Sequence, residues 1–241
     1  MIEASKSERL GPPGSSEEDN ARVNVDAMLQ AILGRGSERF GMTAAVLQGG
    51  RIIAQGAADR ITLDDRFHLG SCTKAMTATL VAMLVEEGKL NWTTTLGELF
   101  AGTVELMHPA WQKVTVRQVL AHRAGLPLDP EGPARVFDYL FVAPYARARS
   151  GPGAARTPRA RLDSSEEPLP GQRLAIATQA LSRPPKIPPD AKYWYSNVGY
   201  ILAGAVLEHL TGRAWEDLMR ERLFQPLGII TGGFGAAGHR W

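Results

Sequence analysis

The chain has 241 residues, of which 44% are hydrophobic and 22% are charged, and its formal net charge at pH 7 is +2. A chain of this length can bury well over half of its unfolded surface, so we expect a soluble globular protein with one large or two small domains. The slight net charge gives no reason to expect a nucleic-acid partner, and the single cysteine excludes an internal disulfide.

The N-terminal segment, residues 1–22, is rich in Ser, Glu, Gly and Pro and lacks the apolar stretch that a signal peptide needs. We expect this segment to be a disordered tail. The sequence contains no run of eighteen apolar residues, so it predicts no membrane span. These features favour a cytoplasmic location, with export as the alternative if the start of the chain is misassigned.

The first elements after the tail are a helix and a hairpin. The pattern of residues 23–33 predicts a helix that ends at Gly34. Residues 43–47 and 51–55 predict two strands joined by a Gly-Gly turn. Farther along the chain the pattern becomes helical, with connections rich in proline and glycine. The helices predicted there are 71–88, 115–123, 171–182, 198–211 and 214–224.

A serine and a lysine stand three residues apart where the first of these later helices begins. Side chains with this spacing share one face of a helix, so Ser71 and Lys74 form a candidate nucleophile and base, an SxxK motif. We expect Lys74 to be removed from solvent and within hydrogen-bonding reach of Ser71, because an amine accepts a proton only when it is uncharged. Backbone N–H groups at the helix end would stabilise an oxyanion on the attacked carbonyl.

Two other interpretations of this stretch stay open. Ser71 is also a good helix N-cap, which would be a purely structural role; a lysine in the first helical turn opposes the helix dipole and argues against it. Cys72 is an alternative nucleophile, with His68 or His122 as its base, because a thiol at a helix N-terminus is activated. If Ser71 is the nucleophile, we expect Cys72 to face inward as a small apolar filler.

A second polar pattern, Tyr195-Ser196-Asn197, lies between a proline-rich segment and the predicted helix 198–211. Side chains two residues apart point the same way in an extended loop, so Tyr195 and Asn197 would face one site, a YxN motif. The Tyr195 phenol can relay a proton to a leaving group, and the Asn197 amide can bridge Lys74 to a substrate carbonyl. The structural alternatives are that Asn197 caps the helix and that Tyr195 packs on the core.

With these motifs, the chain resembles the serine hydrolases related to class C β-lactamases, D-alanyl-D-alanine peptidases and family VIII carboxylesterases. The resemblance implies that Ser71 is the acylated nucleophile and that Lys74 and Tyr195 share the acid–base work. It implies that Asn197 supports both the substrate and the lysine. Four segments carry the likeness and stand in the family's order: residues 67–74, the threonine-capped helix and Gly-Leu-Pro turn of 114–127, 195–200, and 225–228.

The resemblance also implies an α+β fold of the β-lactamase/transpeptidase type, in which an antiparallel sheet flanked by helices is joined to a mostly helical part. It predicts a single domain, residues 23–241, with the site in a cleft between its two parts. We expect the α/β part to comprise 23–70 and 213–241, and the mostly helical part 71–212.

One motif of that family has no match in this sequence. It is a Lys-Thr-Gly or His-x-Gly triplet on a strand well after the tyrosine, and it supplies a second N–H to the oxyanion. His68-Leu69-Gly70 has the right letters but directly precedes Ser71. We therefore expect a chain shortened at its C-terminus, with the last strands of the sheet missing.

Together these features predict a serine hydrolase that acts on esters, β-lactams or related amides through an acyl-enzyme on Ser71. Its partner would be a small-molecule ester, lactam or peptide-like substrate, and no cofactor is expected. The alternative is a binding module that is catalytically silent or traps its ligand covalently, which the missing third motif favours. The five histidines show no metal-ligand spacing, so no metal is predicted. The arginine-rich segment 145–162 predicts a solvated loop, or alternatively a rim that attracts anionic substrates.

Overall fold

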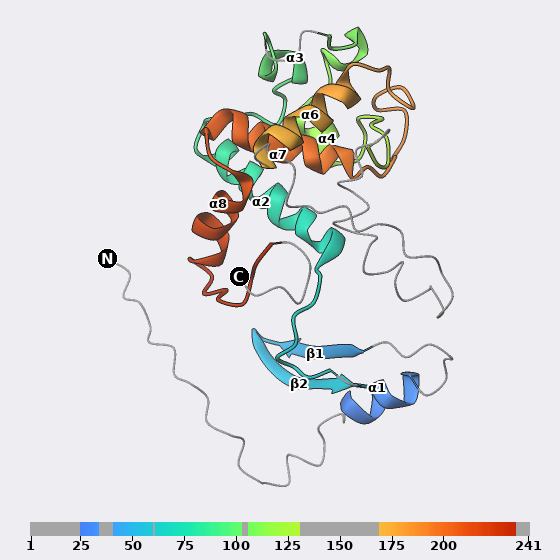
Figure 1. Cartoon of the computed structure of the whole chain (residues 1–241), viewed down its shortest axis with the longest axis vertical. Helices are drawn as coiled ribbons and strands as arrows, with labels where there is room; N and C mark the ends of the chain where they lie inside the picture. Colours follow the sequence, from blue (N-terminus) through green and yellow to red (C-terminus); the bar gives the residue numbers. More distant parts are fainter. Residues whose placement is uncertain (1–24, 34–40, 60, 103–105, 131–168, 235–241) are drawn as a thin grey trace, which may run out of the picture. The chain divides into compact units, whose positions relative to one another are not determined.

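The chain separates into two compact units, residues 1–66 and residues 67–241. The computed structural model describes residues 25–33, 41–59, 61–102, 106–130 and 169–234 (Figure 1). The predicted disordered tail and the arginine-rich segment 145–162 lie outside the described residues.

The first unit contains the predicted helix and hairpin. Helix α1 (Val25–Leu33) contacts both strands, β1 (Met42–Gln48) and β2 (Arg51–Ala58), which pair antiparallel. The turn between the strands is formed by Gly49 and Gly50, with φ of 56° and 77°. A two-residue turn with positive φ at both positions matches the twist of paired strands, which explains the two glycines. The side chains buried in this unit are Val25, Leu29 and Ala58.

The second unit is built from helices around α7 (Val198–Thr211), which contacts four of the others: α2, α4, α6 and α8. All five helices predicted in this region are present (Figure 1). The helical segments besides α7 are the 3₁₀ turn Gly70–Cys72, α2 (Thr73–Glu86), α3 (Leu96–Leu99), the 3₁₀ turn Pro109–Trp111, α4 (Val116–Leu120), α6 (Leu169–Leu181), α8 (Trp215–Met219) and the π-helical turn Arg220–Phe224.

Two short helices of this unit begin with the same local motif. At α4 the Thr115 hydroxyl accepts the Gln118 N–H at 3.3 Å, while the Gln118 side chain accepts the Thr115 N–H at 2.8 Å. This reciprocal pair confirms the predicted threonine cap. Thr95 and Glu98 form the same capping box at α3, a helix that we did not predict from the sequence.

Helix α4 is shorter than the predicted 115–123, because the chain leaves the helix at His122, where φ is +57°. It turns again at Gly125, where φ is +80° and a Cβ would lie 2.1 Å from the carbonyl oxygen of Ile187. Only glycine allows this backbone conformation together with so close an approach of another backbone segment. We call residues 122–129, which follow α4, the site loop.

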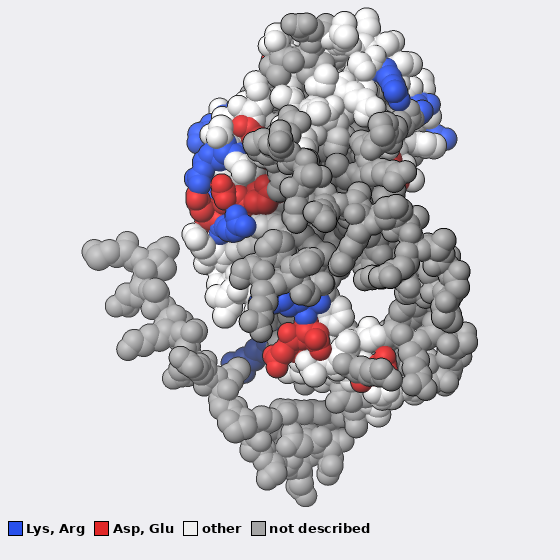
Figure 2. Space-filling model, viewed as in Figure 1, with Lys and Arg blue, Asp and Glu red and all other residues white. Residues whose placement is uncertain are grey.

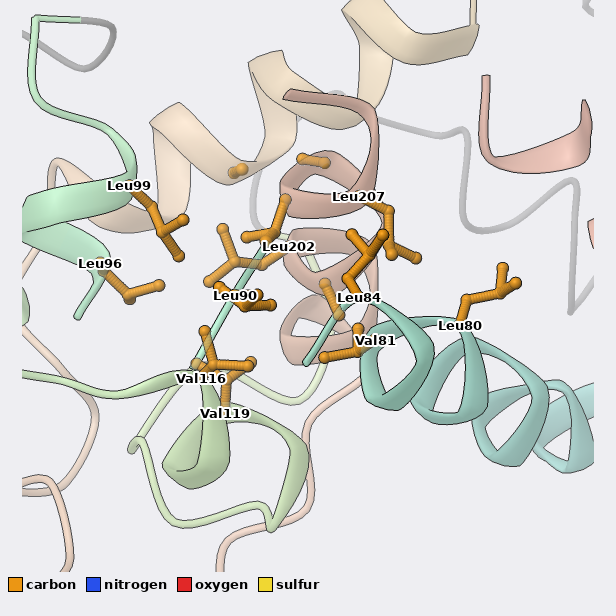
Figure 3. Packing of buried hydrophobic residues seen from close by; sticks show 14 of the residues in the cluster. Leu80, Val81, Leu84, Leu90, Leu96, Leu99, Val116, Val119, Leu202 and Leu207 are labelled. Atoms are coloured by element: carbon orange, nitrogen blue, oxygen red, sulfur yellow. The ribbon is translucent and has the colours of Figure 1, made fainter. Parts of the chain in front are cut away.

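The core of the second unit holds α2 against α7. Leu80, Val81 and Leu84 on α2 and Leu202 and Leu207 on α7 are each 1% exposed or less. These side chains form one cluster with residues of α3 and α4 (Figure 3). Burial of such side chains stabilises a fold by about 1.5–3 kcal/mol each. This packing therefore holds the first turns of α2 and α7 in fixed positions relative to each other. The residues of both polar motifs lie at these helix beginnings.

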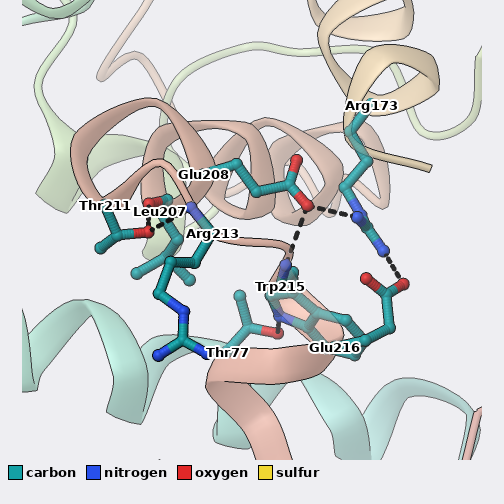
Figure 4. Close-up of polar contacts among 8 residues, drawn as sticks. All are labelled: Thr77, Arg173, Leu207, Glu208, Thr211, Arg213, Trp215 and Glu216. Carbon is teal, nitrogen blue, oxygen red and sulfur yellow. Dashed lines mark hydrogen bonds and ion pairs between the residues drawn. The ribbon is translucent and has the colours of Figure 1, made fainter. Parts of the chain in front are cut away.

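A charged cluster joins α6, α7 and α8 (Figure 4). Arg173 forms ion pairs with Glu208 and Glu216, and the Trp215 N–H donates to Glu208 Oε1 at 3.0 Å. The Trp215 indole donates to the Thr77 hydroxyl at 3.2 Å. Glu208 Oε2 is buried and has no hydrogen-bond partner among the described residues. Burial raises the pKa of Glu208, although the Trp215 N–H and the charge of Arg173 lower it in part.

Helix α8 lies within the second unit, where it contacts α2 and α7. Side chains of both charge signs lie together around it (Figure 2), and they include the ion pairs Arg213–Glu221 and Arg220–Asp217. The expected division of a single domain, 23–241, with residues 213–241 beside the sheet and a site in a cleft, stays a prediction. None of the helices in the described ranges has both the length and the apolar character needed to cross a membrane.

Candidate active site

Three polar side chains from different parts of the second unit meet at one serine hydroxyl. Ser71 lies in the 3₁₀ turn before α2, Lys74 in the first turn of α2, and Tyr195 three residues before α7. Lys74 Nζ donates to Ser71 Oγ at 3.1 Å, and the Tyr195 phenol oxygen lies 2.7 Å from the same atom. The structure thus brings together the three residues that the sequence predicted to meet.

The Ser71 hydroxyl is exposed and makes its hydrogen bonds with Lys74 and Tyr195. Cys72 holds the N-cap position of α2, without a side-chain cap. The N–H groups of Cys72 and Thr73 already donate to carbonyl oxygens of the turn. The Ser71 N–H has no acceptor among the described residues, so it is available to an oxyanion formed next to its own Oγ.

The ammonium group of Lys74 is surrounded by electron-rich groups. Its Nζ donates to Asn197 Oδ1 at 2.6 Å as well as to Ser71. The ring centroids of Tyr195 and Tyr200 lie 4.8 and 5.6 Å from it. Oxygen acceptors and aromatic faces both favour a positive charge. Lys74 is half-buried, and these contacts hold its terminal group between the beginnings of α2 and α7.

The Tyr195 phenol has a perturbed acidity. Burial raises its pKa, but the hydrogen bonds with Lys74 and Ser71 and the positive charge of Lys74 outweigh burial, so the net pKa lies below its usual value. The negative charge of Asp129 acts in the opposite direction. A phenol whose pKa is lowered in this way is better suited to accept and return a proton near neutral pH.

Asn197 stands at the N-cap position of α7, but its side chain does not cap the helix, so that interpretation is wrong. Ser196 does so instead, because its Oγ accepts an α7 backbone N–H at 2.9 Å and donates to the Pro127 carbonyl at 2.6 Å. The Asn197 amide is thereby left for other contacts. Its Oδ1 accepts from Lys74, and its Nδ2 donates to Asp129 Oδ1 at 2.7 Å.

The site loop runs alongside the YxN motif and holds its backbone. The Trp194 N–H donates to the His122 carbonyl at 2.7 Å, and the Asn197 N–H donates to the Leu128 carbonyl at 2.7 Å. Ser196 also donates to the Pro127 carbonyl, so both the beginning and the end of the site loop are hydrogen-bonded to the segment that contains the motif. The orientation of Tyr195 and Asn197 therefore depends on this loop.

The His122 side chain packs against the Tyr195 ring. Its imidazole lies 4.5 Å from the Tyr195 ring and 5.5 Å from the Tyr193 ring, measured between centroids. Its Nδ1 accepts the Ser196 N–H at 3.1 Å. Burial and the positive charge of Lys74 both lower the pKa of His122, which keeps the imidazole neutral and Nδ1 free to accept.

The other candidate groups of the sequence fit a catalytic role less well. Cys72 is exposed, so the expectation that it faces inward is wrong. The Nδ1 atoms of the two histidines considered as its base already accept backbone N–H groups, at 3.1 Å for both His68 and His122. Within the described ranges, no group of three His, Cys, Asp or Glu side chains could hold a metal ion.

Sequence reasoning missed three contributors to this site: His122 as a support, Asp129 and Ser196. A signal existed for Ser196, because a serine directly before an apolar helical run is a typical N-cap. Asp129 gave none, since it lies 68 residues from its partner Asn197 and forms no recognisable motif with it.

Comparison with known proteins gives a consistent result. The Beta-lactamase family model matches residues 25–239. An unguisins hydrolase of Aspergillus campestris is 27% identical over 201 residues, which covers 78% of this chain and 32% of that protein. Penicillin-binding protein 4 of Amycolatopsis lactamdurans is 28% identical over 178 residues, which covers 74% of this chain and 38% of that protein.

A solved structure is also similar to this chain. A D-stereospecific amidohydrolase from Streptomyces sp. matches with a TM-score of 0.54 and 29% identity, over 78% of this chain and 48% of that chain. The chain therefore spans about a third of the length of the two curated relatives and about half of the solved structure.

Proposed function

The chain belongs to the β-lactamase family, and from this premise we propose that it carries the nucleophile and the proton-transfer groups of a serine hydrolase. The predicted resemblance and the predicted α+β fold class are confirmed. The observation that carries the proposal is the convergence of Lys74 Nζ and the Tyr195 phenol oxygen on Ser71 Oγ. A hydroxyl placed between an amine and a phenol is the arrangement that an activated serine needs.

In the first step, the Ser71 oxygen attacks the carbonyl carbon of an ester or amide, and its proton passes to the Tyr195 phenol oxygen in the deprotonated form that the lowered pKa of Tyr195 makes more accessible. The 2.7 Å separation of the two oxygens allows the proton to lie on either one. Lys74, whose Nζ donates to Ser71 Oγ and lies 4.8 Å from the centroid of the Tyr195 ring, acts in this proposal as a cation beside the phenolate. This division of labour differs from the expectation that an uncharged Lys74 is itself the base.

The tetrahedral intermediate then collapses. Its oxyanion, stabilised by the Ser71 N–H, re-forms the carbonyl as the bond to the leaving group breaks. Tyr195 returns the proton to the departing oxygen or nitrogen, which leaves an ester on Ser71. Water attacks this ester in the reverse sequence of proton transfers, and the free acid and Ser71 are restored. Asn197 supports the cation through the bond to its Oδ1 at 2.6 Å.

We propose esters, β-lactams or related amides as the substrate class. All three present a carbonyl carbon to an exposed hydroxyl, and in each the oxygen or nitrogen of the cleaved bond takes up one proton. The named relatives, a hydrolase, a penicillin-binding protein and an amidohydrolase, support the β-lactam and amide part of this range.

A second candidate is a module that is acylated but turns over slowly or not at all. No Lys-Thr-Gly or His-x-Gly triplet follows Tyr195 in the sequence. In serine hydrolases generally, removal of one oxyanion donor costs about a hundredfold to a thousandfold in rate. Acylation without turnover would therefore still be consistent with the geometry around Ser71.

A labelling experiment on the full chain separates these functions. A fluorophosphonate probe should modify Ser71 stoichiometrically, as read by mass spectrometry, and a chromogenic short-chain ester should be hydrolysed. Ser71→Ala should abolish both signals. Ser182→Ala, which removes an exposed hydroxyl that lies directly after α6 and donates to the Gln179 carbonyl, is the matched control and should change neither. Labelling without turnover would favour the trapping module, and no labelling of the native chain would overturn the proposal.

A further inference from the structure

The side-chain amide of Asn197 lies between a group that only donates hydrogen bonds and a group that only accepts them. Its Oδ1 accepts from Lys74 Nζ at 2.6 Å, and its Nδ2 donates to Asp129 Oδ1 at 2.7 Å. An ammonium has no acceptor and an ionised carboxylate has no donor. A rotation of the amide by half a turn would break both bonds, so the two partners select a single orientation.

The fold itself sets the position of the Asp129 carboxylate. The two residues before it, Pro127 and Leu128, accept hydrogen bonds from Ser196 and Asn197 at 2.6 and 2.7 Å. The backbone that carries Asp129 is therefore tied to the residue that its side chain contacts. An exposed polar contact is usually worth little because both partners must be ordered, but here most of that ordering is already provided.

We propose that Asp129 is a positioning residue, which orients the Asn197 amide so that its oxygen holds Lys74 against Ser71 and Tyr195. This inference rests on the proposed function, because it assigns Asp129 a part in keeping the proton-transfer groups together. Asp129 acts through Asn197 and touches none of the reacting atoms.

Asp129 affects the phenol in two opposite ways. Its negative charge raises the pKa of Tyr195, whereas its hold on Asn197 keeps Lys74 close and so lowers that pKa. Two variants separate these effects because both remove the charge. Asp129→Asn keeps the shape and an acceptor for Asn197, while Asp129→Leu keeps neither. The titratable and charged groups that face Tyr195 among the described residues are Lys74, Asp129, His122 and Tyr200.

The test is a titration of Tyr195 in the full chain by NMR of ¹³Cζ-labelled tyrosine, with the resonance assigned from Tyr195→Phe. Asp129→Asn should lower the titration midpoint relative to the native chain, because the charge is lost. Asp129→Leu should have a midpoint above that of Asp129→Asn by about half a pH unit or more, because Lys74 is held less closely. Asp217→Asn, which removes a surface carboxylate on α8, is the control and should leave the midpoint unchanged.

The rate of Ser71 labelling by the fluorophosphonate gives a second readout. Asp129→Leu should label about tenfold more slowly than Asp129→Asn, because misplaced groups lose rate steeply. In an Asn197→Ala background the two variants should label at equal rates. Equal midpoints and equal rates for the two Asp129 variants would overturn the inference. If the native chain is not labelled at all, the proposed function fails, whereas the tyrosine titration still decides the role of Asp129.

Discussion

Replacing Gly125 by alanine should destabilise the second unit and disturb the candidate active site together. Gly125 has a φ of +80°, and a Cβ at this position would lie 2.1 Å from the Ile187 carbonyl oxygen and 3.2 Å from its carbon. The atoms in the way belong to the backbone and cannot rotate aside. The same two segments are held together by the Lys186 N–H, which donates to the Gly125 carbonyl at 2.9 Å. The substitution therefore forces the site loop away from the segment that precedes Tyr195.

The expected magnitude combines two costs. A residue with a Cβ in the left-handed region costs about 1–2 kcal/mol relative to glycine. Inserting an atom into a closely packed contact costs about 1–3 kcal/mol more. The total of about 2–5 kcal/mol is a large fraction of the stability of a typical domain, which is about 5–15 kcal/mol. Labelling of Ser71 should also slow, because the site loop holds the backbone of Tyr195 and Asn197.

Urea unfolding followed by circular dichroism measures the change in unfolding free energy. Gly88→Ala is the matched control, because Gly88 has a φ of +70° and nothing lies within 4 Å of its would-be Cβ. This control carries the conformational cost alone, about 1–2 kcal/mol. The reasoning is refuted if Gly125→Ala is no more destabilising than Gly88→Ala and if the probe labels Ser71 of this variant at the native rate. The close approach to Ile187 would then have no energetic role.

Two further substitutions test the electrostatics. Lys74→Met should raise the pKa of Tyr195, because the group that lowers it is lost; a tyrosine titration midpoint at or below the native one would contradict this. Glu208→Gln should weaken a pH dependence of stability. Because burial raises the pKa of Glu208, the folded chain keeps a proton that the unfolded chain has lost, and the unfolding free energy falls as pH rises from the unfolded pKa through the folded one. Urea unfolding from about pH 4 to 8 should show a smaller fall in the variant; an unchanged fall would exclude Glu208 as its source.

Local patterns predicted most of the elements. The hairpin at Gly49-Gly50 and the capped helix at Thr115 depend on hydrogen bonds and backbone angles within a few residues. Both could therefore be predicted from neighbouring residues in the sequence. The same holds for Ser71 and Lys74, because helical spacing alone puts them on one face. The exposure of a side chain depends on packing between distant segments, and its prediction was less accurate. Cys72, for example, was expected to face inward but is exposed.

The amino-acid sequence by itself determined the two pairs to which we assign the proposed chemistry: a hydroxyl and an amine one helical turn apart, and a phenol and an amide two residues apart. Only the tertiary structure decided how these two pairs meet and which atom of the Asn197 amide faces Lys74. That outcome depends on buried side chains that hold α2 against α7 and on Asp129, which lies 68 residues from Asn197. Contacts between segments so far apart form only when the core has fixed both helices, and no local spacing in the chain encodes them.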